Sequence, residues 1–280
     1  MNFLTKLANS IRESSSVLCI GLDPNSARLP EQVRAFSEDP VEQVVYFCHQ
    51  IIRATEKHCA AFKPNLAFFE AYGVEGWKSF KKVSDYLNDR YPDHFTIADA
   101  KRGDIGNTAA RYAKAYFETF GYDAITIAPY IGKDAISPFL EYKNNHTILL
   151  ALTSNPSAKD FQYSKENDLL LFEKILKLSQ EWDNSENLMY VVGATKSESL
   201  KSIRKLVPNS FLLVPGIGAQ GGSLRDVATF GLNSKCGLLV NSSRGIIYAS
   251  DKNDFDIAAA EKAKILQLEM ENYLKSAGII

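Results

Sequence analysis

Cysteine and histidine are scarce in this 280-residue chain, which has four of each. The cysteines form no C-x-x-C pair and lie in apolar stretches, which favours buried, reduced thiols over a disulfide framework or a zinc site. The histidines show no ligand spacing, and three of them fall on expected helices or loops, so we predict no metal site. These residues are Cys19, Cys48, Cys59 and Cys236, and His49, His58, His94 and His146.

Neither sign of charge is in excess, because 32 Lys and Arg face 33 Asp and Glu, a formal net charge of -1. This balance argues against a nucleic-acid partner and implies that any anionic ligand is small and locally bound. No apolar run approaches the roughly 18 residues that cross a bilayer. The first residues, 1–7, predict an amphipathic helix rather than a signal peptide. We therefore expect a cytoplasmic protein without a membrane segment.

What the chain does have is a series of short, continuous apolar runs, and 45% of its residues are hydrophobic. Such runs are typical of parallel strands that are buried on both faces. Eight of them occur, at 17–24, 60–65, from Phe95, and at 124–129, 147–155, 188–193, 211–215 and 237–241. Helical patterns separate most of them, at 40–58, 76–88, 105–120, 135–142, 168–182, 198–206 and 255–273.

This alternation predicts a single (β/α)8 TIM barrel over residues 1–280, with an extra N-terminal helix. A doubly wound open sheet is the competing arrangement. The barrel is favoured because there are eight strands and because polar residues end many of them. In a barrel these ends meet at one rim. The residues concerned are Asp23, Lys63, Asp99, Lys101, Ser154 and Arg244.

The third strand carries the most unusual pattern, Asp99-Ala-Lys101-Arg-Gly-Asp104. Side chains alternate faces along a strand, so Asp99 and Lys101 are predicted to point the same way, at the end of an apolar interior. An ordinary alternative is an ion pair at a strand end, followed by Asp104 capping a helix that begins near Ile105.

The segment Pro215-Gly-Ile-Gly-Ala-Gln220-Gly-Gly matches G-x-G-x-x-G. A dinucleotide site would need an acidic residue at the end of the next strand, but that strand ends in Asn-Ser-Ser-Arg244. We favour a phosphate-binding cup after the seventh and eighth strands, in which glycines expose backbone N–H groups, Arg244 grips the anion and Gln220 closes over it. The alternative is a tight turn beside a surface cation.

Lys63, Asp99, Lys101 and Asp104 are expected to form an alternating array near the centre of the rim. At about 4 Å and an effective dielectric constant near 20, each opposite pair gains on the order of 4 kcal/mol before desolvation is counted. Such an array keeps Asp99 ionised and leaves Lys101 ready to donate a proton.

At these residues the sequence resembles the orotidine 5'-phosphate decarboxylase family, in the family's order and over almost the whole chain. In Asp104-Ile-Gly-Asn-Thr108 this chain has Gly where many members of the family have Pro. In this respect it resembles a longer bacterial and protozoan subgroup. The motifs are Gly-Leu-Asp23-Pro, Phe-Lys63-Pro-Asn, Asp99-Ala-Lys101-Arg-Gly-Asp104-Ile-Gly-Asn-Thr108, Leu-Thr-Ser154-Asn-Pro, Pro215-Gly-Ile-Gly-Ala-Gln220 and Asn-Ser-Ser-Arg244.

The resemblance implies decarboxylation of orotidine 5'-phosphate to uridine 5'-phosphate without a metal or cofactor. It implies that Asp99 lies against the substrate carboxylate and that Lys101 protonates C6. It further assigns the remaining positions: Lys63 and Asp23 to the ribose hydroxyls, Ser154 to the pyrimidine edge, Pro215, Gln220 and Arg244 to the phosphate end, and Asp104 and Thr108 to the neighbouring site of a homodimer.

Two other functions stay open at this point. One is a metal-dependent sugar-phosphate decarboxylase similar to 3-keto-gulonate 6-phosphate decarboxylase, although Lys63 stands where a metal-binding carboxylate is expected. The other is a phosphate-binding or regulatory barrel without catalysis, which the complete set of charged residues argues against.

Overall fold

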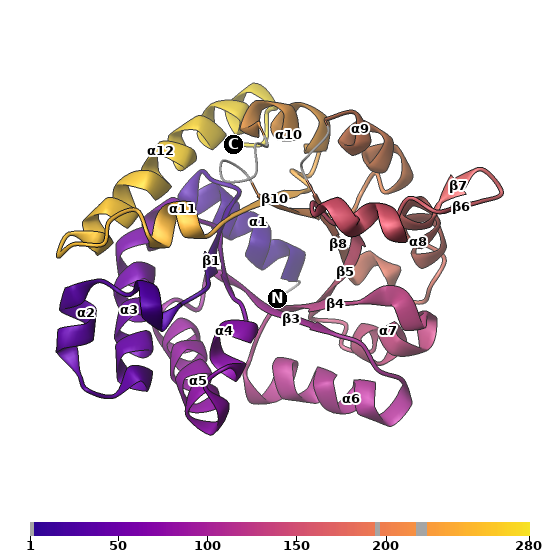
Figure 1. Ribbon diagram of the computed structural model, residues 1–280. Coiled ribbons are helices and arrows are strands. Elements are labelled where there is room, and N and C mark those ends of the chain that lie inside the picture. The colour runs from indigo at the N-terminus through magenta and orange to yellow at the C-terminus, as the bar shows by residue number, and fades with distance from the viewer. Residues whose placement is uncertain (1–2, 194–196, 217–222) are drawn as a thin grey trace.

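The computed structural model describes residues 3–193, 197–216 and 223–280. Within them, eight parallel strands close a barrel in the order β1-β10-β9-β8-β5-β4-β3-β2, and helices surround it (Figure 1). The predicted (β/α)8 barrel is confirmed, and a doubly wound sheet is excluded because β1 pairs with β10. The strands are β1 Leu18–Leu22, β2 Ala61–Pro64, β3 Phe95–Arg102, β4 Ala124–Ile127, β5 His146–Leu152, β8 Leu188–Val192, β9 Leu212–Pro215 and β10 Leu238–Ser242.

The barrel strands are apolar on both faces because each lies between the barrel interior and the ring of helices. Every residue of β1, β2, β4 and β10 is buried. This burial explains why the strands appear in the sequence as continuous hydrophobic runs rather than as alternating ones.

The helices bury amphipathic faces against the outside of the strands. In α3, Asp39 accepts a hydrogen bond from the Val41 N–H at 2.9 Å, and Pro40 occupies the first turn, so both start signals lie in the sequence. The helices of the barrel layer are α2 Glu31–Phe36, α3 Pro40–Thr55, α4 Ala67–Glu70, α5 Gly73–Arg90, α6 Gly106–Lys114, α7 Lys133–Leu140, α8 Leu171–Ser179, α9 Ser197–Leu206, α10 Leu224–Gly231, α11 Arg244–Ile247 and α12 Phe255–Ser276.

The structure differs from the sequence-based elements in several connections. The polar stretch after β1 contains the short helix α2, and helix α10 stands between β9 and β10, where we predicted none. The helix predicted over 105–120 is an α-helix only from Gly106 to Lys114, and one π-helical turn follows it over Ala115–Thr119. The helix expected from Asp168 begins at Leu171, because a hairpin of β6 (Lys165–Glu166) and β7 (Leu169–Leu170) precedes it.

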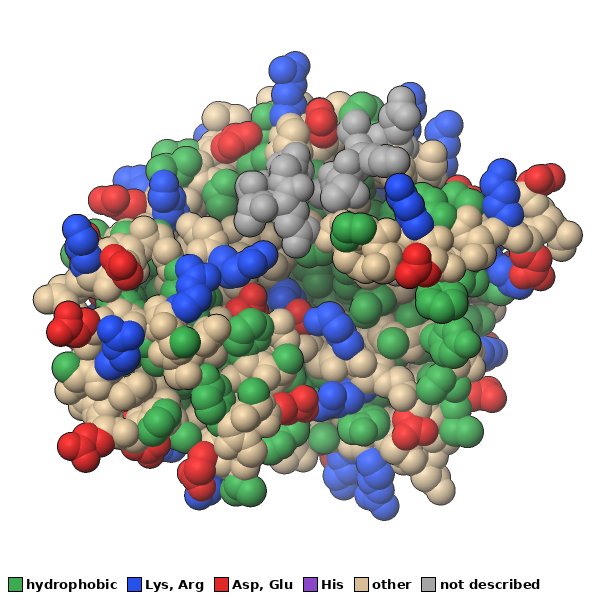
Figure 2. Space-filling model, viewed as in Figure 1, with side chains coloured by type: hydrophobic (Ala, Val, Ile, Leu, Met, Phe, Trp, Pro, Cys, Tyr) green, Lys and Arg blue, Asp and Glu red, His purple; other side chains and the backbone are tan. Residues whose placement is uncertain are grey.

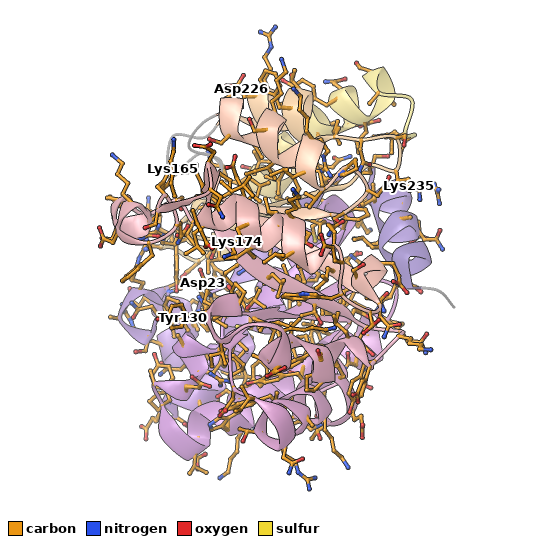
Figure 3. All side chains as sticks on the ribbon, turned by 90° about the vertical axis from the view of Figure 1, so that its right-hand side faces the viewer. Asp23, Tyr130, Lys165, Lys174, Asp226 and Lys235 are labelled. Carbon is orange, nitrogen blue, oxygen red and sulfur yellow. The ribbon has the colours of Figure 1, made fainter. Side chains whose placement is uncertain are left out.

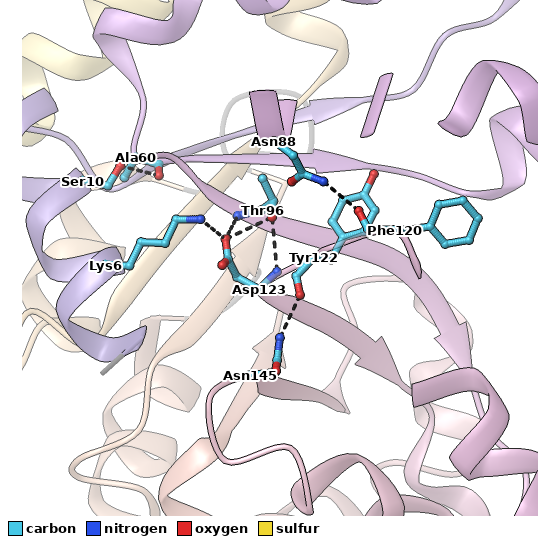
Figure 4. Close-up of polar contacts among 9 residues, drawn as sticks. All are labelled: Lys6, Ser10, Ala60, Asn88, Thr96, Phe120, Tyr122, Asp123 and Asn145. Atoms are coloured by element: carbon cyan, nitrogen blue, oxygen red, sulfur yellow. Dashed lines mark hydrogen bonds and ion pairs between the residues drawn. The ribbon is translucent and has the colours of Figure 1, made fainter. Parts of the chain in front are cut away.

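Helix α1 (Phe3–Ser14) is the predicted additional helix, and it lies across the end of the barrel opposite to the strand ends that carry the charges (Figure 1). Lys6 Nζ pairs with Asp123 Oδ2 at 2.7 Å, and Ser10 Oγ donates to the Ala60 carbonyl at 2.7 Å (Figure 4). Asp123 Oδ2 also accepts from the Thr96 backbone and side chain. Burial raises the pKa of Asp123 more than Lys6 lowers it. Burying this carboxylate therefore costs free energy, which its hydrogen bonds and the ion pair with Lys6 offset in part.

All four cysteines are buried and free, as predicted. In the part of the chain that the structure describes, no helix has the length and apolar character needed to cross a membrane.

Candidate active site

The candidate site lies at the carboxyl ends of the strands, where Figure 2 shows acidic and basic side chains together in a hollow at the centre of the face. Lys63 is on β2, and Asp99 and Lys101 are on the adjacent strand β3. Lys63 is 6% exposed and Asp99 is 8% exposed, whereas the Lys101 side chain is half exposed. The structure therefore places two buried charges and one accessible ammonium at the rim, as the sequence predicted.

The Asp99 carboxylate is shared between two ammonium groups. Its Oδ2 lies 2.6 Å from Lys63 Nζ and its Oδ1 lies 2.6 Å from Lys101 Nζ. Burial by itself raises the pKa of Asp99, but Lys63 and Lys101 outweigh burial and hold this pKa well below its usual range. Likewise, burial lowers the pKa of Lys63, but Asp99 and Asp23 outweigh it and the net direction is upward. Asp99 and Lys63 therefore remain ionised together.

Asp23 follows β1 and lies near Lys63, whose pKa it raises. Its Oδ2 accepts a hydrogen bond from Ser243 Oγ at 2.6 Å, and its carbonyl accepts one from the Tyr248 hydroxyl at 3.0 Å. Gly21 permits this contact, because a Cβ there would lie only 2.8 Å from Ser243 Cβ. Among the described residues, the buried Oδ1 atoms of Asp23 and Asn241 have no hydrogen-bond donor. Buried acceptors without donors are rare, and they mark this part of the rim as a candidate binding region.

Asp104 is not brought into the array of its own chain. Its Oδ1 accepts from the Ile105 N–H at 2.8 Å, and it forms no ion pair within the described ranges. The alternative prediction that Asp104 caps a helix is wrong, because the N-cap of α6 is Ile105 and has no side-chain cap. Thr108 lies exposed in the first turn of α6. In the described residues neither side chain forms an ion pair or hydrogen bond with Lys63, Asp99 or Lys101.

Ser154 follows β5 and packs against the end of β8. A Cβ on Gly193 would lie 2.7 Å from the Ser154 backbone nitrogen, so the absence of a side chain at Gly193 allows the two strand ends to approach. The loop before Ser154 is fixed by Gln162, which accepts from the Thr153 N–H and donates to Thr153 Oγ1, both at 2.8 Å. Ser154 is therefore held at the rim, where the sequence predicted it.

The structure describes only part of the predicted phosphate-binding site. Pro215 ends β9 and pairs in register with Asn241 of β10, and Arg244 begins the helix α11 directly after β10. Arg244 is exposed and forms no ion pair with any described residue. Gln220, with Gly218 and Gly221, lies outside the described residues.

Sequence reasoning missed two residues that the structure joins to the site. Ser243 stands in the Asn-Ser-Ser-Arg244 motif, but nothing in the motif indicates its bond to Asp23. Thr126 on β4 donates to Asp99 Oδ1 at 3.0 Å, yet a Thr in an apolar strand carries no signal of this kind. No group of three or more His, Cys, Asp or Glu side chains in the described segments is arranged to hold a metal ion.

Comparison with known proteins gives a consistent result. Residues 16–255 match the family model described as orotidine 5'-phosphate decarboxylase / HUMPS family. The chain belongs to this family. Orotidine 5'-phosphate decarboxylase of Christiangramia forsetii is 54% identical over 270 residues, which cover 96% of this chain and 98% of that protein. The protein of the same name from Flavobacterium johnsoniae is 54% identical over 271 residues, which cover 97% and 98%.

Solved structures of the family from protozoa share the fold. Leishmania donovani OMP decarboxylase has a TM-score of 0.80 at 33% identity, covering 96% of this chain and all of that chain. Plasmodium berghei orotidine 5'-monophosphate decarboxylase has a TM-score of 0.82 at 26% identity, covering 99% of both chains.

Proposed function

We propose that this protein decarboxylates orotidine 5'-phosphate to uridine 5'-phosphate and CO₂, the last step of UMP synthesis, without a metal or organic cofactor. The observation that carries the proposal is the Lys63–Asp99–Lys101 group at the barrel rim, with 2.6 Å between the ions of each pair. Membership of the family and the names of relatives with 54% identity support the same reaction.

The proposed reaction breaks the bond between C6 and the substrate carboxylate. CO₂ leaves, the electron pair remains on C6, and a proton from Lys101 Nζ completes the product. Asp99 stays ionised because of its two cationic neighbours, so it disfavours a second carboxylate next to it while Lys101 favours the negative charge that develops at C6. In this proposal Asp99 destabilises the bound substrate through its carboxylate, and Lys101 stabilises the transition state at the neighbouring C6.

The other positions hold the substrate away from the reacting carbon. Lys63 and Asp23 are proposed to bind the ribose hydroxyls, and Ser154 the pyrimidine edge. Pro215, Gln220 and Arg244 are proposed to form the phosphate end. Binding energy from this remote phosphate lowers the chemical barrier if it brings the charged group onto the substrate.

A direct assay tests the reaction. Purified protein mixed with orotidine 5'-phosphate and excess chelator is expected to lower the ultraviolet absorbance as the substrate is converted, with equal rates with and without chelator. Loss of turnover on chelation favours the metal-dependent sugar-phosphate decarboxylase instead. Substrate binding by calorimetry without turnover favours a binding or regulatory barrel.

We also propose that the protein acts as a homodimer in which Asp104 and Thr108 enter the partner's site. Three apolar side chains are exposed near these residues, after the adjacent strands β3 and β4: Ile105 at 53%, Tyr130 at 90% and Ile131 at 50%. Figure 3 shows Tyr130 on the same side of the barrel as Asp23. A second copy would cover this surface and supply the carboxylate that the single chain keeps away from Lys101.

Complementation tests the shared site. Lys101→Ala and Asp104→Ala are each expected to be nearly inactive, whereas an equal mixture that is allowed to exchange subunits regains about one quarter of the wild-type activity. Half of the dimers in the mixture are mixed, and each mixed dimer has one intact site of two. A mixture no more active than its components would show that Asp104 acts in its own chain.

The buried, free cysteines and the near-zero net charge support a cytoplasmic enzyme with a small-molecule substrate and no nucleic-acid partner.

A further inference from the structure

The pairing of β3 with β4 is interrupted beside the ionised groups. Ala98 pairs with Ile125, and the next pair is Arg102 with Ile127. Three residues of β3, 99–101, therefore stand opposite the single residue Thr126 of β4. An irregularity of this kind bends a strand and redirects its side chains, and such bulges are frequent next to active sites.

Lys101 carries the backbone strain of this bulge. Its φ is +49°, in the left-handed region that residues with a Cβ adopt with difficulty. Lys101 is also the proposed proton donor, so its backbone conformation determines where Nζ points. A strained conformation persists only if surrounding contacts fix it.

The Thr126 hydroxyl provides two such contacts. Oγ1 accepts a hydrogen bond from the Lys101 backbone N–H at 3.0 Å and donates its own proton to Asp99 Oδ1 at 3.0 Å. The same Asp99 oxygen receives Lys101 Nζ at 2.6 Å. Thr126 is 1% exposed, so its hydroxyl is buried together with its two partners. The Thr126 hydroxyl thus forms hydrogen bonds where the bulge interrupts the pairing of β3 with β4. It links the Asp99 side chain to the Lys101 backbone, and the Lys101 side chain contacts the same Asp99 oxygen.

We propose that Thr126 is a positioning residue for the decarboxylation, an inference that rests on the proposed function. It holds the left-handed turn at Lys101 and the orientation of the Asp99 carboxylate, and it acts through these two residues rather than on the substrate. Its branched Cβ restricts χ1, which keeps the hydroxyl between its two partners.

Three variants test this role. Thr126→Val keeps the shape and removes the hydroxyl, Thr126→Ser keeps the hydroxyl, and Thr147→Val is the matched control. Thr147 lies on β5, is 1% exposed, and its hydroxyl has no partner among the described residues. We expect kcat to fall about tenfold to a hundredfold in T126V, as for a displaced catalytic group, and to stay within about threefold of wild type in T126S and T147V.

A second measurement separates positioning from a loss of folded protein. The number of sites that bind uridine 5'-phosphate, and their affinity, are measured by calorimetry, and kcat is expressed per binding site. The product lacks the carboxylate, so T126V should bind it as wild type does while turning over slowly. Equal kcat per site in T126V and T147V would overturn the proposal. If T126V does not fold, Thr126→Ala removes the hydroxyl without adding volume and gives the same comparison.

The result is distinguishable from a failure of the proposed function. Wild-type protein without turnover would overturn the decarboxylase assignment and the role of Thr126 together. Active wild type with an unaffected T126V would overturn the role of Thr126 alone.

Discussion

Lys101→Ala is expected to lose at least about 10⁴-fold in kcat while it folds normally. Proton donation by a positioned group accounts for roughly 10²–10⁴-fold, and stabilisation of charge at the reacting carbon for roughly 10²–10³-fold. Lys101 is proposed to supply both, so its removal affects the transition state much more than substrate binding. Steady-state kinetics with orotidine 5'-phosphate measures the loss.

Folding of Lys101→Ala is expected to survive because Asp99 keeps Lys63 and the Thr126 hydroxyl as partners. The Lys101 side chain is also half exposed, so its pair with Asp99 contributes little to stability. Lys133→Ala on α7, which removes an exposed lysine paired with Asp183, is the control and should keep full activity. A modest loss in Lys101→Ala would mean that another residue delivers the proton.

Arg244→Ala is expected to lower kcat/KM for orotidine 5'-phosphate by about 10²–10³-fold, since a guanidinium that binds phosphate makes strong, charge-assisted hydrogen bonds. Orotidine, which lacks the phosphate, should react at the same low rate in the variant and in wild type. The comparison of the two substrates isolates the phosphate contact, because everything else at the reacting carbon is unchanged.

Arg244→Lys and Arg53→Ala complete this experiment. Lysine retains the charge but not the bidentate geometry, so an intermediate loss is expected. Arg53 lies on α3, is exposed, donates a hydrogen bond to Gln50 on its own helix and lies 3.9 Å from Asp256, so its removal should leave activity unchanged. Equal losses of Arg244→Ala on both substrates would show that this residue does not hold the phosphate.

The sequence was most informative where physical constraints are local. A continuous apolar run such as 17–22 indicates a strand buried on both faces, and the Pro40 start of α3 can be identified from one turn of the chain. Connections were predicted less well, because the β6-β7 hairpin and the π-helical turn at Ala115–Thr119 depend on packing against neighbours. These differences leave the rim unchanged.

The sequence by itself determined that Lys63, Asp99 and Lys101 end neighbouring strands, and closure of the barrel then obliges them to meet. Only the tertiary structure decided which oxygen pairs with which ammonium, that Asp104 stays out of its own chain's array, and that Thr126 and Ser243 support the carboxylates. Thr126 is 27 residues from Asp99, and Ser243 is 220 residues from Asp23. Contacts over such separations depend on strand register and on a bulge, which are fixed when the whole barrel packs rather than by any short stretch of sequence.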